Sequence, residues 1–141
     1  MTKRERIAWL RQHSKLVLPE FHTKFGPDPR YLPERYTDYN QDLKIQFWVG
    51  PLADKWDWVA WYHEAIHVAD FDWWTPEIRE LAKPILGGPD RPWFWDRDPR
   101  VESKLPDPYC EALANQLARV CIGWVTMPQL TALYLRAYNR R

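Results

Sequence analysis

Apolar residues recur every three or four positions in four segments of the chain, which is the spacing of helices with one buried face. The segments are residues 2–16, a stretch that begins at Asp54 and contains no Gly or Pro before Pro76, residues 107–124, and the residues after Pro128, where Leu130, Leu133, Tyr134 and Ala137 have core spacing. Thr2 and Glu5 stand in capping-box spacing at the first helix start. The pattern predicts a mainly helical protein.

Residues 43–49 follow a different pattern, because apolar and polar residues alternate at their start and strand-forming residues are frequent. Gly50 and Pro51 then end the segment. We expect one strand here. Residues 17–24 and residues 31–39 are alternative sources of partner strands, and the prolines and glycine of residues 25–33 predict a loop.

A long loop is predicted at residues 83–108, which hold six prolines, two consecutive glycines and the aromatic run Trp93-Phe94-Trp95. A loop of this length inside a compact domain is more often functional than idle. Trp93 and Trp95 are therefore candidates for contact with a substrate. The alternative is that these aromatic side chains cover the hydrophobic core.

The second helical segment contains the pattern His63-Glu64-x-x-His67. One apolar stripe of this helix would consist of Val59, Tyr62, Ile66, Ala69 and Trp73, and the adjacent face of Ala60, His63, His67 and Asp70. Asp54 can cap the helix, with Asp57 at the third position. Two imidazoles one turn apart with a carboxylate beside them are typical of a zinc site that has its own general base.

Two histidines are one ligand short of the usual catalytic zinc set, which has three protein ligands and an open position. The downstream candidates for a third ligand are Asp70, Asp72, Glu77, Glu80, Glu102 and Glu111. Asp70 lies one turn past His67 on the same helix, and its short side chain suits it better to orienting a ligand than to binding the metal.

Glu111 is the preferred third ligand because it stands in the third helical segment, with Asp107 as N-cap and Pro108 at the first position. The core positions of that segment are Cys110, Leu113, Leu117, Val120, Cys121 and Trp124. Ala114 and Ala118 follow Glu111 on the adjacent face, and such small residues let two helices approach closely. The alternative is that Glu111 is a first-turn acid that stabilises the helix dipole.

The pattern His63-Glu64-x-x-His67, followed by Glu111-x-x-Ala114-Asn115-x-Leu117-Ala118 and then Met127-Pro128, resembles the ImmA/IrrE type of metallopeptidase, a compact gluzincin. The resemblance covers roughly residues 43–128. It implies that His63, His67 and Glu111 bind zinc and that Glu64 is the catalytic base. It also implies an α+β, mainly helical zincin-like (minimal gluzincin) domain, with a small β-sheet packed on the HExxH helix.

In gluzincin-like folds the strand before the zinc helix forms the cleft edge, where an extended peptide can pair with it. This likeness makes Gln46, in the expected strand, a further candidate for substrate contact. Asp70 and Asn115 are candidates for orienting the ligands. Tyr109 is the candidate oxyanion donor, with Tyr134, Tyr138 and His22 as alternatives.

Charge and composition make nucleic acid and membranes less expected as partners. The formal net charge of +1 gives no global field for nucleic acid, although basic residues gather at the two ends: Lys3, Arg4, Arg6, Arg11, Arg136, Arg140 and Arg141. No apolar run reaches the roughly 18 residues of a membrane span, and the start of the chain lacks a signal-peptide core. Cys110 and Cys121 lie too far apart in one helix for a disulfide. We expect a cytoplasmic protein.

Three functions follow as hypotheses for a single domain over residues 1–141. The first is a zinc endopeptidase in which Glu64 activates zinc-held water to hydrolyse a protein or peptide substrate. The second is a non-catalytic binding or regulatory module that zinc stabilises. The third is a nucleic-acid-associated protein that uses the basic ends; neither nucleic acid nor membrane is the expected partner. Glu64 favours the enzyme, because a purely structural zinc site has no use for a base.

Overall fold

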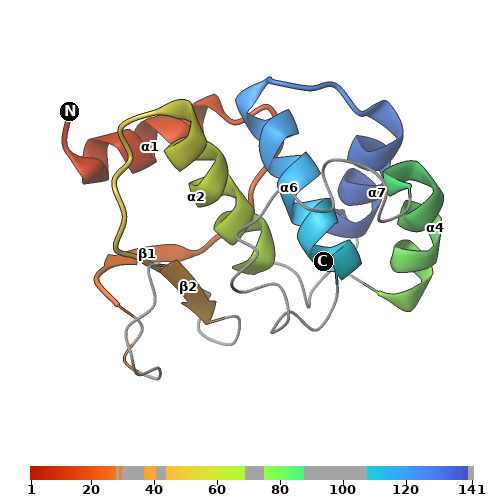
Figure 1. The fold of residues 1–141 in the computed structure, drawn as a ribbon, viewed down its shortest axis with the longest axis horizontal. Coiled ribbons are helices and arrows are strands. Elements are labelled where there is room, and N and C mark those ends of the chain that lie inside the picture. Colours follow the sequence, from red (N-terminus) through yellow and green to blue (C-terminus); the bar gives the residue numbers. More distant parts are fainter. Residues whose placement is uncertain (28, 30–36, 41–43, 69–74, 88–107, 140–141) are drawn as a thin grey trace.

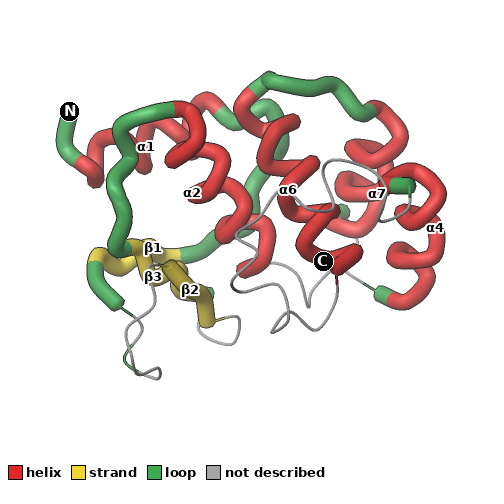
Figure 2. Tube along the Cα trace, viewed as in Figure 1, coloured by secondary structure: helices red, strands yellow, loops and turns green. Residues whose placement is uncertain are grey.

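The computed structural model describes residues 1–27, 29, 37–40, 44–68, 75–87 and 108–139, and these form a mainly helical α+β fold (Figure 1). Along the chain the elements are α1 (Lys3–His13), β1 (His22–Phe25), β2 (Thr37–Asn40), β3 (Ile45–Trp48), α2 (Lys55–Val68), α4 (Pro76–Leu86), α6 (Pro108–Ile122) and α7 (Pro128–Tyr138). Figure 2 shows a small sheet beside α1 and α2, with α6, α7 and α4 on the other side of α2.

The first two helices begin where their capping residues predict. In α1 the Glu5 backbone N–H donates to Thr2 Oγ1 at 3.1 Å, and the Thr2 N–H donates to the Glu5 carboxylate at 3.4 Å. In α2 the Asp57 N–H donates to Asp54 Oδ1 at 2.9 Å, while the Asp57 carboxylate accepts from the Asp54 N–H at 3.2 Å. Side chains thus satisfy backbone donors that a helix start leaves unpaired.

Helix α2 is buried on more than the one stripe that its sequence predicts. Val59, Tyr62 and Ile66 of that stripe are buried, but so are Trp61 and Ala65 on other faces. The reason is that α2 contacts β2 and β3 on one side and α6 on the other. The C-terminal half of the helix therefore lies inside the hydrophobic core, where its side chains have defined positions.

The three described strands form one sheet in the order β1-β3-β2. Strand β1 runs parallel to β3, with Thr23 opposite Gln46, and β2 runs antiparallel to β3. The expected strand within residues 43–49 is thus confirmed, and both candidate partner segments contribute a strand. The expectation that this strand forms a cleft edge is wrong, because β3 is the central strand and pairs with β1 on one side and with β2 on the other. The edges of the described sheet are β1 and β2.

Helix α4 extends to Leu86 and so includes the first residues of the loop predicted at residues 83–108. The Ile78 N–H donates to Thr75 Oγ1 at 3.2 Å, Pro76 takes the first helical position, and Gly87 ends the helix with a φ of 80°. Pro84 suggested a loop, but it lies in the last turn, where a missing N–H removes only one helical hydrogen bond. The loop prediction is therefore wrong for residues 83–86, and residues 88–107 lie outside the described part.

The side chain of Gln46 connects the sheet to α2, and its predicted contact with substrate is wrong. It is fully buried, with 0% of its surface exposed. Its Nε2 donates to the Trp61 carbonyl of α2 at 3.0 Å, and its Oε1 accepts from the Thr23 hydroxyl of β1 at 3.0 Å. The alternation of strand residues placed Gln46 on the face that packs against the helix.

We predict that Gln46→Ala destabilises the fold by about 2–4 kcal/mol, because it removes two buried hydrogen bonds and leaves a small cavity. Gln12→Ala is the matched control, since Gln12 is exposed on α1 and should change the free energy of unfolding by less than about 0.5 kcal/mol. Urea unfolding of both variants measures the difference. Equal unfolding free energies would contradict a structural role for Gln46.

Candidate metal centre

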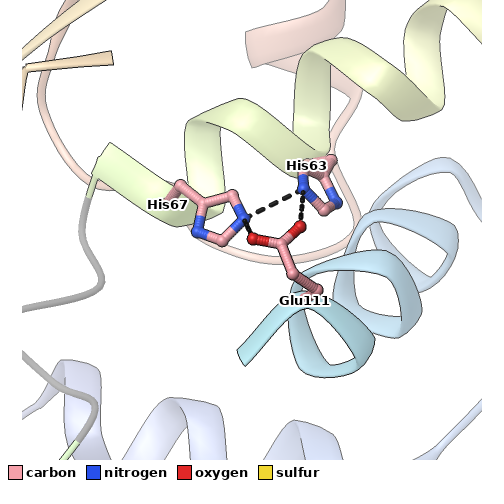
Figure 3. A network of polar contacts seen from close by, with 3 residues as sticks. All are labelled: His63, His67 and Glu111. Atoms are coloured by element: carbon pink, nitrogen blue, oxygen red, sulfur yellow. Dashed lines mark hydrogen bonds and ion pairs between the residues drawn. The ribbon is translucent and has the colours of Figure 1, made fainter. Parts of the chain in front are cut away.

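Three side chains from two helices converge on one point between α2 and α6 (Figure 3). His63 Nε2 lies 3.0 Å from one Glu111 oxygen, and His67 Nε2 lies 3.0 Å from the other. The two Nε2 atoms are 2.9 Å apart. The structure therefore brings together the histidines of the HExxH pattern and the glutamate that the sequence favoured as their partner.

Close packing of the two helices makes this convergence possible. Helices α2 and α6 contact one another more extensively than any other pair of described elements. Ala114 and Ala118 on α6 and Ala65 on α2 are almost completely buried. Small side chains let the two backbones approach closely, so that a glutamate on one helix reaches imidazoles on the other.

The donor atoms fit a divalent metal ion. Zinc bonds of about 2.0–2.1 Å in a tetrahedral arrangement separate neighbouring ligand atoms by about 3.3 Å, so the observed triangle is smaller by only a few tenths of an ångström. Two imidazoles and a carboxylate are a known catalytic zinc set, whereas calcium and magnesium prefer oxygen alone. Among the described residues, His63, His67 and Glu111 thus form a group that could hold a divalent metal ion.

The surroundings of the site favour the charged form of Glu111. The side chains of His63 and Glu111 are each 14% exposed and that of His67 is 5% exposed, so the site is shielded from bulk water but is not closed. Burial by itself would raise the pKa of the Glu111 carboxyl, but hydrogen bonds and positive charge from His63 and His67 together lower its pKa far below its usual range. The carboxylate form that binds metal is the favoured one.

The hydrogen bonding of His63 Nδ1, the ring nitrogen that does not face Glu111, differs from that of typical metal-binding histidines. Its Nδ1 is buried and has no hydrogen-bond partner within the described part of the chain. Histidines that bind metals generally donate from this second nitrogen to a carboxylate or carbonyl. Asp70, which we expected to act as such an orienting group, lies outside the described residues.

The other predicted site residues have separate outcomes. Glu64 follows His63 on α2 and is partly exposed, and Asn115 lies one turn after Glu111 with 8% of its surface exposed. Trp93 and Trp95 lie outside the described residues, and so does the side chain of Tyr109. The roles of these residues stay predictions.

Two alternatives to Tyr109 have other hydrogen-bond partners. The buried Tyr134 hydroxyl donates to the Val17 carbonyl at 2.5 Å, and the Tyr138 hydroxyl donates to the Leu18 carbonyl at 3.4 Å. Both hydroxyls anchor α7 to the segment that follows α1. An oxyanion role for either hydroxyl stays a prediction and would require its proton to leave this carbonyl.

Several basic residues near the two ends of the chain contact other parts of the protein. The Arg6 guanidinium lies 5.2 Å from the Trp9 ring centre and 4.7 Å from that of Trp58. Arg136 pairs with Glu77 at 3.2 Å. These contacts place the Arg6 cation against two aromatic rings and the Arg136 cation beside a carboxylate of α4.

Cys121 is a free, buried thiol, as its position in α6 predicted. Burial raises the pKa of this thiol to about 12. It also lies ten residues beyond Glu111, which is about 15 Å along a helix. Cys121 is therefore a packing residue and is too far along α6 to join the metal ligands.

A cavity of about 810 Å³, which was not predicted from the sequence, lies next to α1 and β1. Its lining residues are Arg4, Ile7, Arg11, Glu20, Phe21, His22, Thr23, Phe25 and Lys44. The available signal was the spacing of Arg4, Ile7 and Arg11, which places them on one face of α1.

Comparisons of this chain with models of protein families, with curated proteins and with solved structures gave no match. Within the described part of the chain, no helix combines the length and the apolar character that crossing a membrane requires.

We predict that Glu111→Ala weakens zinc binding by at least about tenfold, because it removes one of three protein ligands. Glu80→Ala is the matched control, since Glu80 is exposed on α4. Titration against a competing zinc chelator gives both dissociation constants. An unchanged constant for Glu111→Ala would remove Glu111 from the site.

The lowered pKa of Glu111 predicts how the stability of metal-free protein depends on pH. A carboxyl whose folded-state pKa lies below its unfolded value near 4.5 contributes stability above about pH 4.5, and this contribution is lost as the pH falls further. Wild type should thus lose stability relative to Glu111→Gln between pH 4.5 and pH 3. Urea unfolding with a chelator present measures this difference, and a constant difference would contradict the shift.

Proposed function

We propose that this protein is a zinc-dependent peptidase of the ImmA/IrrE type. The observation that supports the proposal is the convergence of His63, His67 and Glu111 from α2 and α6. The sequence resemblance described above assigns the ligand role to the same three residues. The proposed reaction is hydrolysis of a peptide bond in a protein or peptide substrate.

The three side chains would hold zinc through two imidazole nitrogens and the Glu111 carboxylate. When bound, zinc supplies a positive charge that makes water more acidic and polarises a carbonyl oxygen. His63 and His67 are neutral when they serve as ligands, and Glu111 contributes one negative charge. This ligand set leaves part of the metal charge uncompensated, which is what polarisation of a substrate carbonyl requires.

Glu64 is the proposed general base. It follows His63 directly, so its side chain leaves α2 about 100° away from the imidazole and does not compete for the same ligand direction. Its carboxylate would accept a proton from the attacking water and then donate it to the leaving amine. Partial exposure of Glu64 is consistent with contact between this group and a substrate.

A catalytic role accounts for the ligand set better than a structural role does. Structural zinc sites are normally closed by four protein ligands, mostly cysteine and histidine. Within the described residues the metal-ligating group contains three side chains and no cysteine. A position left for water and substrate is the arrangement that a hydrolase needs.

We predict that Glu64→Gln keeps zinc but lowers the rate of peptide hydrolysis by about 100-fold or more, because the amide cannot accept the proton. A random pool of unstructured peptides, followed by mass spectrometry, supplies a readout without a known substrate. Glu80→Gln is the matched control and should cleave at the wild-type rate. Zinc content of each variant is measured on the same samples.

Two results would contradict the proposed function. The first is equal cleavage by wild type and Glu64→Gln, or cleavage that persists after chelation. The second is full zinc occupancy of wild type with no cleavage of any peptide in the pool, which would favour the zinc-stabilised binding module. Loss of zinc from Glu111→Ala tests the ligand set separately.

A further inference from the structure

The cavity beside α1 and β1 lies away from the proposed metal centre. Arg4, Ile7 and Arg11 line it from α1, and Phe21, Thr23 and Phe25 line it from β1 and the residue before this strand. In Figure 1, α1 and β1 lie on one side of α2, whereas α6, which carries Glu111, lies on the other. None of the residues that line the cavity is one of the three candidate metal ligands.

One wall of the cavity is β1, which forms an edge of the sheet in the described part of the chain. The His22 N–H donates to the Lys44 carbonyl at 2.8 Å and the Gly26 N–H donates to the Trp48 carbonyl at 3.0 Å, so these even-numbered residues face β3. Main-chain groups alternate in direction along a strand, which turns those of Thr23 and Phe25 to the opposite side. No strand among the described residues pairs with that side.

A contact of α1 identifies the same free edge. The Arg11 guanidinium donates a hydrogen bond to the Phe21 carbonyl and lies 4.1 Å from the centre of the Phe21 ring. Phe21 is odd-numbered like Thr23 and Phe25, so its carbonyl points away from β3 as theirs do. Because this carbonyl accepts from Arg11, the side of β1 that faces away from β3 faces α1. The main-chain groups of Thr23 and Phe25 therefore point to the same side of the chain as the Phe21 carbonyl that accepts from Arg11.

The charge of the cavity is positive. Its lining contains three side chains that are always cationic at neutral pH, Arg4, Arg11 and Lys44, against one carboxylate, that of Glu20. Arg4 is exposed on α1 and forms no ion pair with another described residue. Lys44, which directly precedes β3, contributes one of these cations. A ligand with several negative charges complements this lining.

Apolar surface accompanies the charge. Phe25 is 43% exposed although it is a large aromatic residue at a strand edge. An exposed sheet edge with an apolar side chain is a template for pairing with another chain. Four residues of β1, at about 3.3 Å each, offer about 13 Å of edge, which is enough for a short extended segment.

We propose that the cleft between α1 and β1 binds an extended acidic segment of another protein, which adds to β1 as a further strand. Main-chain hydrogen bonds to Thr23 and Phe25 give the segment its register. Arg4 and Lys44 bind its carboxylates, and Phe25 packs against its apolar side chains. The proposal goes beyond the proposed hydrolysis and does not rest on it.

The charge part is tested with a fluorescent, end-capped peptide of alternating glutamate and valine and with its lysine counterpart. Fluorescence anisotropy on the full chain should show binding of the acidic peptide only. Arg4→Glu should weaken this binding at least about tenfold, because it replaces an attractive charged hydrogen bond with repulsion. Arg136→Glu, the same charge change on α7, is the matched control and should leave binding unchanged.

The main-chain part is tested by comparing Phe25→Pro with Phe25→Ala. Both remove the ring, but only proline also removes the N–H on the free side, and edge strands tolerate proline there. Phe25→Pro should bind the acidic peptide at least about tenfold more weakly than Phe25→Ala. Circular dichroism shows whether both are folded, and the Arg4→Glu result stands even if Phe25→Pro does not fold.

Four results would overturn the proposal. Two concern charge: equal binding of the acidic and basic peptides, and undiminished binding of the acidic peptide by Arg4→Glu. The third is equal binding by folded Phe25→Pro and Phe25→Ala. The fourth is dimerisation of wild type that Arg4→Glu abolishes, because a second copy of the chain would then be the occupant. Glu111→Ala should bind the peptide as wild type does. Failure of this site and failure of the proposed hydrolysis are therefore distinguishable.

Discussion

The close packing of α2 on α6 is the constraint on which the candidate site depends. His63 and His67 face the same way because they are one helical turn apart, but a third ligand must come from another element. Glu111 of α6 lies 3.0 Å from both imidazoles of α2, and both helices carry buried alanines that permit close packing. A bound metal would in turn stabilise this packing, because binding to the folded state shifts the folding equilibrium.

The sheet and α1 fix the position of α2 from the other side. Gln46 connects β3 and β1 to the Trp61 carbonyl in the middle of α2. The buried Tyr62 hydroxyl donates to the Leu10 carbonyl of α1, and burial raises the pKa of this hydroxyl far above its usual range. These buried hydrogen bonds restrict rotation and sliding of the helix, so the imidazoles have a defined direction.

Local chemistry made several features predictable from the sequence. The capping pairs of Thr2 with Glu5 and of Asp54 with Asp57 involve neighbours in sequence, so their geometry follows from helix spacing alone. The histidine spacing has the same local origin. Glu111 was predictable because it precedes two small residues on one face of a strongly periodic helix, a pattern that indicates close contact with another helix.

Features that depend on distant residues were predicted less well. The central position of β3 follows from pairing with two segments that had weak strand patterns of their own, and Gln46 was misassigned because its partners Thr23 and Trp61 are far away in sequence. Pro84 concealed the end of α4, since a proline in a last turn looks the same in sequence as a loop proline. The cleft beside β1 could not be predicted without the strand order, which shows that β1 is an edge of the described sheet.

Zinc K-edge X-ray absorption of the protein loaded with one equivalent of zinc tests the α2–α6 site most directly. A centre held by His63, His67 and Glu111 predicts two imidazole nitrogens and oxygen neighbours at about 2.0–2.2 Å, with no sulfur at about 2.3 Å. Glu111→Ala should change the oxygen shell and leave the imidazole signal. A sulfur neighbour, a single imidazole, or a spectrum unaffected by Glu111→Ala would contradict the site.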